Sequence, residues 1–215
     1  MQPLREAHYR IEPHYLPSLE FFCAVHHASV IEWEVSGHFV KQTYRNRCQI
    51  LGANGPLTLT VPLDARRNKT LYRDIRIDYR QNWQNIHWRS LESAYRNAPY
   101  FEFYADELRR ELFTGHQFLA DLNIALLTLC LRWIKRAPMA ARTESFDIHT
   151  PGGIIDLRDR ISARTGFETR PFYQPQPYYQ VFGKAFAANL SIVDLLCCEG
   201  PGASLLLEQC TVQQG

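Results

Sequence analysis

The stretch HYRIEPHYLPSLEFFCAVHHASVIEWEV, residues 8–35, constrains the fold of this chain more than any other. It has the pattern of a strand, a tight loop, a helix and a second strand. In the helical part, side chains recur at positions i, i+3, i+4 and i+7, namely Leu19, Phe22, Cys23 and His26. A strand–helix–strand unit of this length is nearly always right-handed, with parallel strands. We therefore predict an α/β fold that starts with a βαβ unit.

The loop that follows the first strand is the first candidate for a functional site. In open α/β sheets, ligands bind beyond the carboxyl ends of the strands. Here that position is occupied by His14 and Tyr15, an imidazole and a phenol that can move a proton or contact a ligand. We therefore include both residues among the candidate site residues.

A hairpin is predicted by the Asn54-Gly55 pair within LGANGPLTLTVPL, residues 51–63. A two-residue type I′ turn needs positive φ at both central positions, which Asn-Gly pairs supply. The turn predicts a hairpin over about 47–63. It also predicts the register, in which the residues that share the apolar face are paired as Cys48 with Val61 and Ile50 with Leu59.

The first arm of this hairpin begins in KQTYRNRCQI, which places three cations beside hydrogen-bonding side chains. Alternation along the strand predicts that Tyr44 and Asn46 face the core and that Arg45 and Arg47 point away from it. Two interpretations remain open. In both, a buried Asn46 hydrogen-bonds the backbone and anchors the strand; either the arginines and Lys41 solvate an edge strand, or they clamp an anionic ligand.

Two further elements are predicted between residues 72 and 99. The alternation in Tyr72–Tyr79 predicts an added strand, with the isoleucines inward and Asp78 outward. Residues 82–99 predict an amphipathic helix capped by Asn82. His87 and Tyr95 lie on one face of that helix. His87 is either a hydrogen-bonded core histidine or a group that transfers protons near neutral pH.

The rest of the chain predicts helices and irregular segments within a single domain, residues 1–215. Residues 105–113 and 118–136 are predicted helices, and 137–153 is a predicted connector before a C-terminal portion. That portion holds an aromatic-rich segment, 166–186, and a helix within NLSIVDLLCCEGPG that Asn189 or Ser191 can cap.

Composition excludes some functions and favours others. The net charge of +2 excludes a grossly basic nucleic-acid binder. The longest apolar stretch, Ile124–Leu131, is too short for a membrane span. Residues 1–20 lack the apolar core of a signal peptide, and six scattered cysteines form no CxxC pair, so we expect a cytoplasmic protein. Cys23, His26 and His27 superficially resemble metal ligands, but no second ligand pair follows, so no metal site is predicted. No cofactor motif is found.

Five fragments recur in a recognisable order: PHYLPSLEFF, KQTYRNRCQI, NGPLTLTVPL, WQNIHW with YRNAPYF, and LSIVDLLCCEGP. Together they resemble the WbqC-like protein family over nearly the whole chain. That family typically opens with Gln-Pro where this chain has Glu12-Pro13, which changes the local charge. The family is associated with O-antigen and surface-polysaccharide gene clusters.

The resemblance implies one site shared by distant segments. Its candidate catalytic residues are His14, His87 and Tyr95. Its candidate substrate-binding residues are Tyr15, Lys41, Tyr44, Arg45, Asn46, Arg47, Gln180, Asp194 and Glu199. Such a set suits an anionic small molecule, for example a nucleotide or a sugar nucleotide, because guanidinium groups bind phosphate in a fork-like geometry.

Three functions follow as hypotheses. The first is a small-molecule transferase that uses a nucleotide-linked sugar or an activated acyl or aminoacyl donor, with His87 as the acid–base group. The second is a non-catalytic binding or assembly protein of the envelope-polysaccharide machinery. The third, nucleic-acid binding through residues 41–47, is disfavoured by the near-zero net charge. The transferase hypothesis requires that cations of the hairpin and the imidazole of His87 share one pocket.

Overall fold

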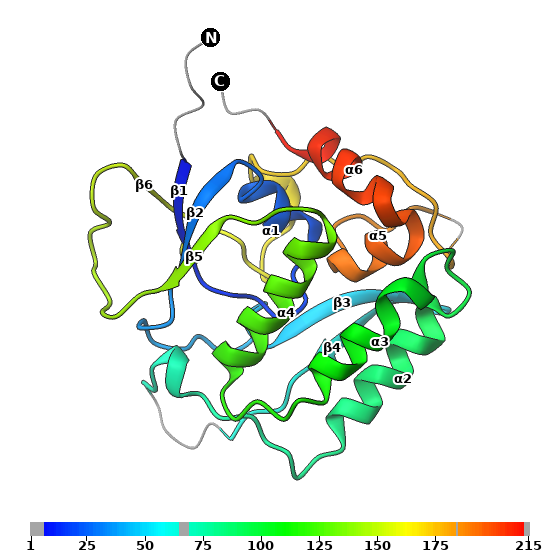
Figure 1. Cartoon of the computed structure of the whole chain (residues 1–215), viewed down its shortest axis with the longest axis horizontal. Coiled ribbons are helices and arrows are strands. Elements are labelled where there is room, and N and C mark those ends of the chain that lie inside the picture. The colour runs from blue at the N-terminus through cyan, green and yellow to red at the C-terminus, as the bar shows by residue number, and fades with distance from the viewer. Residues whose placement is uncertain (1–6, 65–68, 184, 213–215) are drawn as a thin grey trace.

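The computed structural model describes residues 7–64, 69–183 and 185–212 (Figure 1). Its central sheet contains four parallel strands: β1 (Ala7–Ile11), β2 (Ala28–Trp33), β5 (Met139–Arg142) and β6 (Ile154–Asp156). Helix α1 (Leu19–Ala24) connects β1 to β2. The predicted α/β class and the N-terminal βαβ unit with its parallel strand pair are therefore confirmed.

The strand order β5-β2-β1-β6 determines where the sheet can hold a ligand. The chain leaves β1 towards β2 and β5, and then returns to form β6 on the other side of β1. The strand order thus changes direction at β1, and open α/β sheets bind ligands at such a point, beyond the carboxyl ends of the strands. Residues 137–153 were expected to be a connector, but part of this segment forms strand β5.

The predicted hairpin forms a separate two-stranded sheet, with β3 (Arg47–Gly52) and β4 (Gly55–Thr60). Its register differs from the predicted one by two residues, because Cys48 pairs with Leu59 and Ile50 with Leu57. The turn residues are Ala53 and Asn54, and the positive φ of the turn falls on Gly55 (φ 106°). Since side chains alternate with a period of two, the shift preserves the buried face of Cys48, Ile50, Leu59 and Val61.

The added strand predicted for Tyr72–Tyr79 does not form. Its first residues form a 3₁₀ helix, η1 (Tyr72–Asp74), and the rest makes two isolated bridges. The physical reason is that the N–H groups of Tyr72 and Arg73 donate to loop carbonyls, those of Gly37 (2.8 Å) and Val35 (2.9 Å), and not to a neighbouring strand. Ile75 and Ile77 are buried as predicted, but Asp78 is buried as well.

Five helices follow η1 in the described residues. They are α2 (Trp83–Tyr95), α3 (Phe101–Leu112), α4 (Leu119–Trp133), α5 (Ile192–Glu199) and α6 (Ala203–Cys210). Two more short 3₁₀ helices are η2 (Phe167–Thr169) and η3 (Gly200–Gly202). Helix α2 packs against β3, and α3 packs against α4 and α5 (Figure 1). Within the described ranges, no helix has the length and apolar character needed to cross a membrane.

The two predicted helix caps have different outcomes. Ser191 caps α5 as predicted, because its hydroxyl accepts a hydrogen bond from the Val193 N–H (3.3 Å). Asn189 instead accepts from the Glu20 N–H (2.9 Å) and so connects the start of α5 to α1. Asn82 occupies the N-cap position of α2, but its side chain makes no capping bond and accepts from the Asn85 amide.

Candidate functional site

The carboxyl edge of the parallel sheet gathers charged side chains from four segments. These are Glu12 after β1, Glu34 after β2, Arg158 and Asp159 after β6, and Arg45 from the loop before β3. Backbone hydrogen bonds hold the strand ends together, since the Glu34 N–H donates to Ile11 O (2.9 Å) and the Leu157 N–H donates to Arg10 O (2.9 Å). These side chains therefore meet because parallel strands end at one edge.

A pocket of about 240 Å³ opens at this edge, and we call it the carboxyl-edge pocket. Its lining residues are Glu34, Gly37, His38, Val40, Arg45, Tyr72, Phe146, Arg158 and Asp159. Two carboxylates and two guanidinium groups balance in charge, and two aromatic rings complete the wall. Such a lining supplies both acceptors and donors, which suits a neutral, hydroxyl-rich ligand group better than a bare anion.

Glu34 is held in one orientation by the loops that follow β2 and β5. Its Oε1 accepts hydrogen bonds from the N–H groups of Ser36 (2.8 Å) and Gly37 (3.0 Å) and from the Thr143 hydroxyl (2.9 Å). Its Oε2 lies 3.4 Å from an Arg158 nitrogen. With Oε1 saturated by these donors, Oε2 is the oxygen available for a ligand hydroxyl.

Arg158 is fixed by a fork-like ion pair with Asp156 at the end of β6. Its Nε and Nη2 donate to the two carboxylate oxygens of Asp156, at 3.0 and 2.6 Å. These hydrogen bonds hold the pKa of the Asp156 carboxyl well below its usual range. The guanidinium also lies over the Phe146 ring, 4.9 Å from its centroid. Its other N–H groups donate to Asp147 O (2.7 Å), Thr150 Oγ1 (3.0 Å) and Glu34 Oε2 (3.4 Å), so Arg158 is held in one position in the pocket wall.

Glu12 forms the buried base of this cluster and is only 2% exposed. Its carboxylate accepts from the Asp159 N–H (3.1 Å) and lies 3.4 Å from both Arg45 Nη2 and His14 Nε2. Burial alone would raise the pKa of Glu12, but the His14 hydrogen bond and the Arg45 charge outweigh it, so the pKa is lowered. The acid that replaces the expected glutamine is therefore ionised and neutralised by Arg45.

Arg45 is buried, which corrects the prediction that it points away from the core. The reason is that β3 begins at Arg47, so strand alternation does not extend back to residue 45. Its Nη2 lies 2.8 Å from Asp159 Oδ1, and its Nε has no hydrogen-bond partner among the described residues. Burial opposes ionisation of Arg45, but the charges of Glu12 and Asp159 raise its pKa above the usual value.

Two residues that sequence reasoning missed hold this cluster from below. The Asn123 side-chain amide donates to Arg45 O (2.6 Å) and to the Tyr72 hydroxyl (2.6 Å), and the Tyr72 hydroxyl donates to Pro13 O (2.5 Å). Asn123 is fully buried in α4. A lone asparagine in the apolar run LADLNIALL was the signal that could have identified it, because buried amides need hydrogen-bond partners.

His87 and Tyr15 form a buried pair that lines neither of the larger pockets described here. His87 Nδ1 lies 2.8 Å from the Tyr15 hydroxyl, and the imidazole packs edge-on against the Trp83 ring. Burial lowers the pKa of His87 to about 4, against a smaller opposing effect of a hydrogen bond with the Thr60 backbone. His87 is therefore neutral at pH 7, and its geometry fits the first of the two interpretations, a hydrogen-bonded core histidine.

His14 and Tyr44 lie side by side behind the carboxyl-edge pocket. The His14 ring packs between Phe21 and Tyr44, with centroid distances of 5.0 and 5.7 Å. His14 Nδ1 is buried and has no partner among the described residues. The Tyr44 carbonyl accepts from the Tyr15 N–H (3.0 Å). Through Glu12, His14 thus contacts the charged cluster, whereas His87 does not.

The C-terminal candidates form a separate cluster around Asp194. Its Oδ2 accepts from the Tyr178 hydroxyl (2.6 Å) and from the Gln180 amide (3.0 Å). Asp194 is fully buried, and this burial raises its pKa. Tyr95 lies nearby and accepts from the Leu51 N–H (3.2 Å), while Glu199 ends α5. None of the predicted C-terminal residues lines the carboxyl-edge pocket.

Lys41, Asn46 and Arg47 share a second pocket, of about 320 Å³, which we call the cationic pocket. Its other lining residues are Phe39, Gln42, Thr60, Val61, Pro62 and Leu63. The Asn46 amide donates to Val61 O (3.0 Å), and Asn46 O accepts from the Val61 N–H (2.8 Å). Asn46 thus ties the strand ends together, which both interpretations of this segment expect. The cations of residues 41–47 are divided between two pockets.

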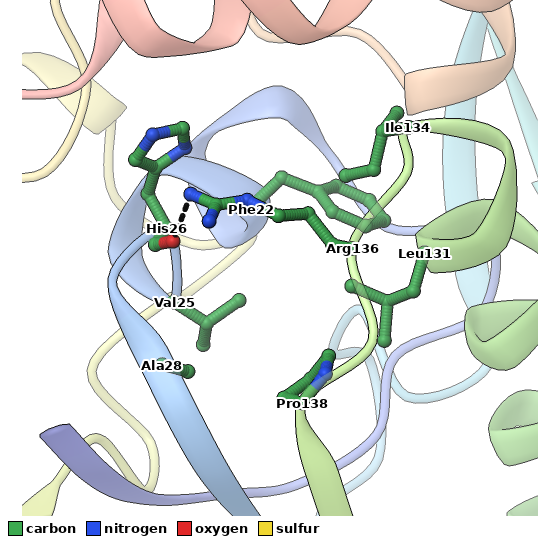
Figure 2. Close-up of a pocket in the computed structure, with 8 residues that line it drawn as sticks. All are labelled: Phe22, Val25, His26, Ala28, Leu131, Ile134, Arg136 and Pro138. Carbon is green, nitrogen blue, oxygen red and sulfur yellow. Dashed lines mark hydrogen bonds between the residues drawn. The ribbon is translucent and has the colours of Figure 1, made fainter. Parts of the chain in front are cut away.

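A third pocket lies at the opposite, amino end of the sheet (Figure 2). It measures about 20 Å³, room for one water molecule, and is lined by Phe22, Val25, His26, Ala28, Leu131, Ile134, Arg136 and Pro138. Arg136 donates to the His26 carbonyl across it (Figure 2). Burial, followed by the charge of Arg136, lowers the pKa of His26 to about 4. Its size and largely apolar wall make it a packing gap.

The described residues contain no group of three or more His, Cys, Asp or Glu side chains that could hold a metal ion. All six cysteines are buried and unbridged. Burial raises the pKa of Cys48 and Cys130, so their thiols stay protonated at neutral pH.

One comparison with known proteins finds a match. The model of the WbqC-like protein family matches residues 12–169, well over half of the chain. The matched stretch includes all the residues that line the carboxyl-edge and cationic pockets, whereas the Asp194 cluster and the fragment LSIVDLLCCEGP lie outside it. No curated protein and no solved structure matches the chain.

Proposed function

The chain belongs to the WbqC-like protein family, and we propose that it is a small-molecule transferase of surface-polysaccharide metabolism of the O-antigen type. Its donor is a nucleotide-linked sugar or another activated molecule with an anionic group. The observation that carries this proposal is the carboxyl-edge pocket, where separate segments place Glu34, Arg158 and Asp159 around one space. Pockets at this edge of a parallel sheet are where α/β proteins bind ligands.

The lining of the carboxyl-edge pocket supports a sugar as the group that it holds. Glu34 and Asp159 can each accept from a sugar hydroxyl, and the Arg158 N–H that lies 3.4 Å from Glu34 Oε2 can be shared with a sugar oxygen. The Phe146 and Tyr72 rings offer apolar surface for the C–H face of a sugar. Because Glu34 and Arg158 are already held by their neighbours, binding would order few side chains, which favours affinity.

The shared pocket of His87 and the hairpin cations, which the transferase hypothesis required, is not found, because His87 lines neither larger pocket. We therefore propose Asp159, and not His87, as the proton acceptor. Its side chain is 67% exposed at the pocket, whereas His87 is enclosed by Tyr15 and Trp83. In the reaction, an O–H or N–H of the acceptor attacks the donor carbon. The bond from that carbon to the anionic leaving group breaks with its electron pair, and the proton passes to an Asp159 oxygen.

The backbone at Asp159 supports this assignment. Asp159 adopts φ 56°, a left-handed conformation that is uncommon for residues other than glycine. Its N–H is thereby directed to Glu12, and its carboxylate to Arg45. Residues held in such conformations cluster at functional sites, because the surrounding structure has to maintain them.

Titration with a panel of nucleotide-linked hexoses tests the proposal by thermal denaturation and NMR. A donor at about a hundredfold excess over its Kd should stabilise the wild type by about 2.7 kcal/mol. Asp159→Asn should bind the donor and lose turnover, and Glu34→Gln should lose affinity. Arg89→Gln, an exposed change on α2, serves as the control with unchanged binding. If no donor shifts the melting temperature or any NMR signal, the proposal is wrong.

A non-catalytic binding or assembly protein is the second candidate. It is favoured by the cationic pocket, because Lys41 and Arg47 lie there without a carboxylate in its described lining and could contact an acidic partner. The two candidates differ in what Asp159 does. A folded Asp159→Asn variant that restores full polysaccharide synthesis in cells would favour the assembly role over catalysis.

A further inference from the structure

One segment, residues 37–47, separates the two larger pockets. Side chains alternate over residues 38–41: His38 and Val40 line the carboxyl-edge pocket, whereas Phe39 and Lys41 line the cationic pocket. The chain then turns at Gln42, which has φ 61° and also lines the cationic pocket. The same division recurs later in the segment, where Arg45 lies on one side and Asn46 and Arg47 lie on the other.

The two pockets differ in charge. The carboxyl-edge pocket balances two carboxylates against two guanidinium groups. The described lining of the cationic pocket holds Lys41 and Arg47 and no carboxylate. Among the described residues, Arg45 forms ion pairs with Glu12 and Asp159, whereas Lys41 and Arg47 form none. Two neighbouring cations without counter-charge attract an anion and repel each other until one is bound.

Two buried polar atoms at this pocket also lack partners. Asn46 is 8% exposed, and its Oδ1 makes no hydrogen bond with the described residues. Arg47 Nε is buried and equally unpartnered. A buried donor or acceptor without a partner costs about 1–3 kcal/mol. The Arg47 donor therefore favours a ligand with acceptor oxygens, whereas the Asn46 oxygen needs a donor such as a water molecule. This observation is independent of the net charge.

We propose that the cationic pocket is a binding site for a phosphoryl group, the diphosphate or phosphate monoester of a ligand. The guanidinium of Arg47, which lines the pocket, donates to two phosphate oxygens, and the Lys41 ammonium supplies the second positive charge. The Thr60 hydroxyl, at the end of β4, is a further donor in the lining. The second N–H of the Asn46 amide is available as well, because only one is needed for Val61 O.

This site goes beyond the proposed transferase. It lies across residues 37–47 from the pocket assigned to the sugar, and its ligand is recognised by charge and not by hydroxyl groups. The proposed phosphoryl site is therefore compatible with a catalytic protein and with a non-catalytic one. The occupant is a phosphorylated small molecule, since a pocket of about 320 Å³ has room for such a group.

Calorimetric titration with inorganic pyrophosphate tests the site in the full-length protein. The wild type should bind pyrophosphate with a Kd below about 1 mM. Lys41→Gln and Arg47→Gln should each weaken binding by roughly tenfold, since each removes a charge-assisted contact. Arg47→Lys, which keeps the charge and loses the fork, should lie between Arg47→Gln and the wild type. Raising the salt concentration should also weaken binding.

Controls separate this site from the carboxyl-edge pocket. Lys41 is exposed, so Lys41→Gln tests the charge without a risk to folding. Glu34→Gln and Asp159→Asn should leave pyrophosphate affinity unchanged, and Arg89→Gln should do the same. Wild-type protein that binds no pyrophosphate at about 1 mM, or a Lys41→Gln/Arg47→Gln double variant with wild-type affinity, would overturn the inference. Failure of the sugar-donor titration alone would leave it standing.

Discussion

The carboxyl-edge pocket and the cationic pocket share one wall, but they differ in how their charges are arranged. In the first, Arg45 and Arg158 are each held by carboxylates, with distances down to 2.8 and 2.6 Å. In the second, Lys41 and Arg47 have no such partners in the described lining. The difference teaches that charged residues close in sequence can have different roles: paired charges shape a site, and unpaired charges attract a ligand.

The largest effect expected from this comparison is on stability. Arg45→Ala removes the counter-charge of Glu12, which is 2% exposed and would be left buried and unpaired. Breaking a buried pair in this way typically costs about 3–5 kcal/mol. The matched change Arg47→Ala removes a partly buried arginine without an ion pair in the described chain, so it should cost about 1 kcal/mol or less.

Urea denaturation at pH 7 measures both variants of that pair. The comparison holds if Arg45→Ala loses several times more unfolding free energy than Arg47→Ala. Equal losses would mean that both arginines serve packing alone, and the distinction between a structural and a ligand-binding cation would then be wrong.

A second prediction concerns the pH dependence of the Glu12 pair. The pKa of Glu12 is lowered in the folded protein, so its stabilisation is present above the unfolded value, about 4.3, and is lost as the pH falls through the folded value. Glu12→Gln keeps the shape and removes the charge. At pH 7 it should lower the free energy of unfolding, because the lowered pKa of Glu12 means that its charged form is stabilised in the folded protein.

Denaturation midpoints of the wild type and Glu12→Gln, measured from neutral pH down to about pH 3, test this directly. The two curves should converge as the pH falls, while pyrophosphate binding by the cationic pocket shows no loss from this substitution. A constant gap between the two curves at every pH would contradict the assigned pKa direction.

The smallest expected effect has the opposite sign and comes from Asp194. Among the described residues, no cation pairs with this buried carboxylate. Burial raises its pKa, so its contribution is full below the unfolded value, about 3.9, and is lost as the pH rises through the folded value. The stability of Asp194→Asn should therefore rise relative to that of the wild type as the pH rises through the folded pKa of Asp194. Thermal melts of both proteins at several pH values show whether the slopes of Asp194 and Glu12 differ in sign.

Local patterns predicted much of the fold because local physics decides it. The βαβ unit follows from apolar spacing and from the handedness of strand crossovers. The hairpin face was correct although the register was not, since a shift of two residues keeps every side chain on its face. The strand expected at Tyr72–Tyr79 was wrong because its N–H groups find their acceptors at Val35 and Gly37, which no local pattern reveals.

The candidate site was predictable only in part. The loop after β1 and the cations of residues 41–47 were expected, and the resemblance to the WbqC-like family drew attention to Glu12. Glu34, Arg158 and Asp159 were missed, because each follows a different strand and none belongs to a motif. The single pocket expected for Arg45 and Arg47 is two pockets, since the residues lie on opposite sides of segment 37–47.

The sequence by itself determined which segments become strands and helices of the βαβ unit, which hairpin face is buried, and which family the chain resembles. Only the tertiary structure decided which charges meet. The physical reason is distance along the chain: periodicity acts over a few residues, whereas Glu12, Arg45 and Asp159 come together because parallel strands end at one edge and the oppositely charged groups neutralise each other there.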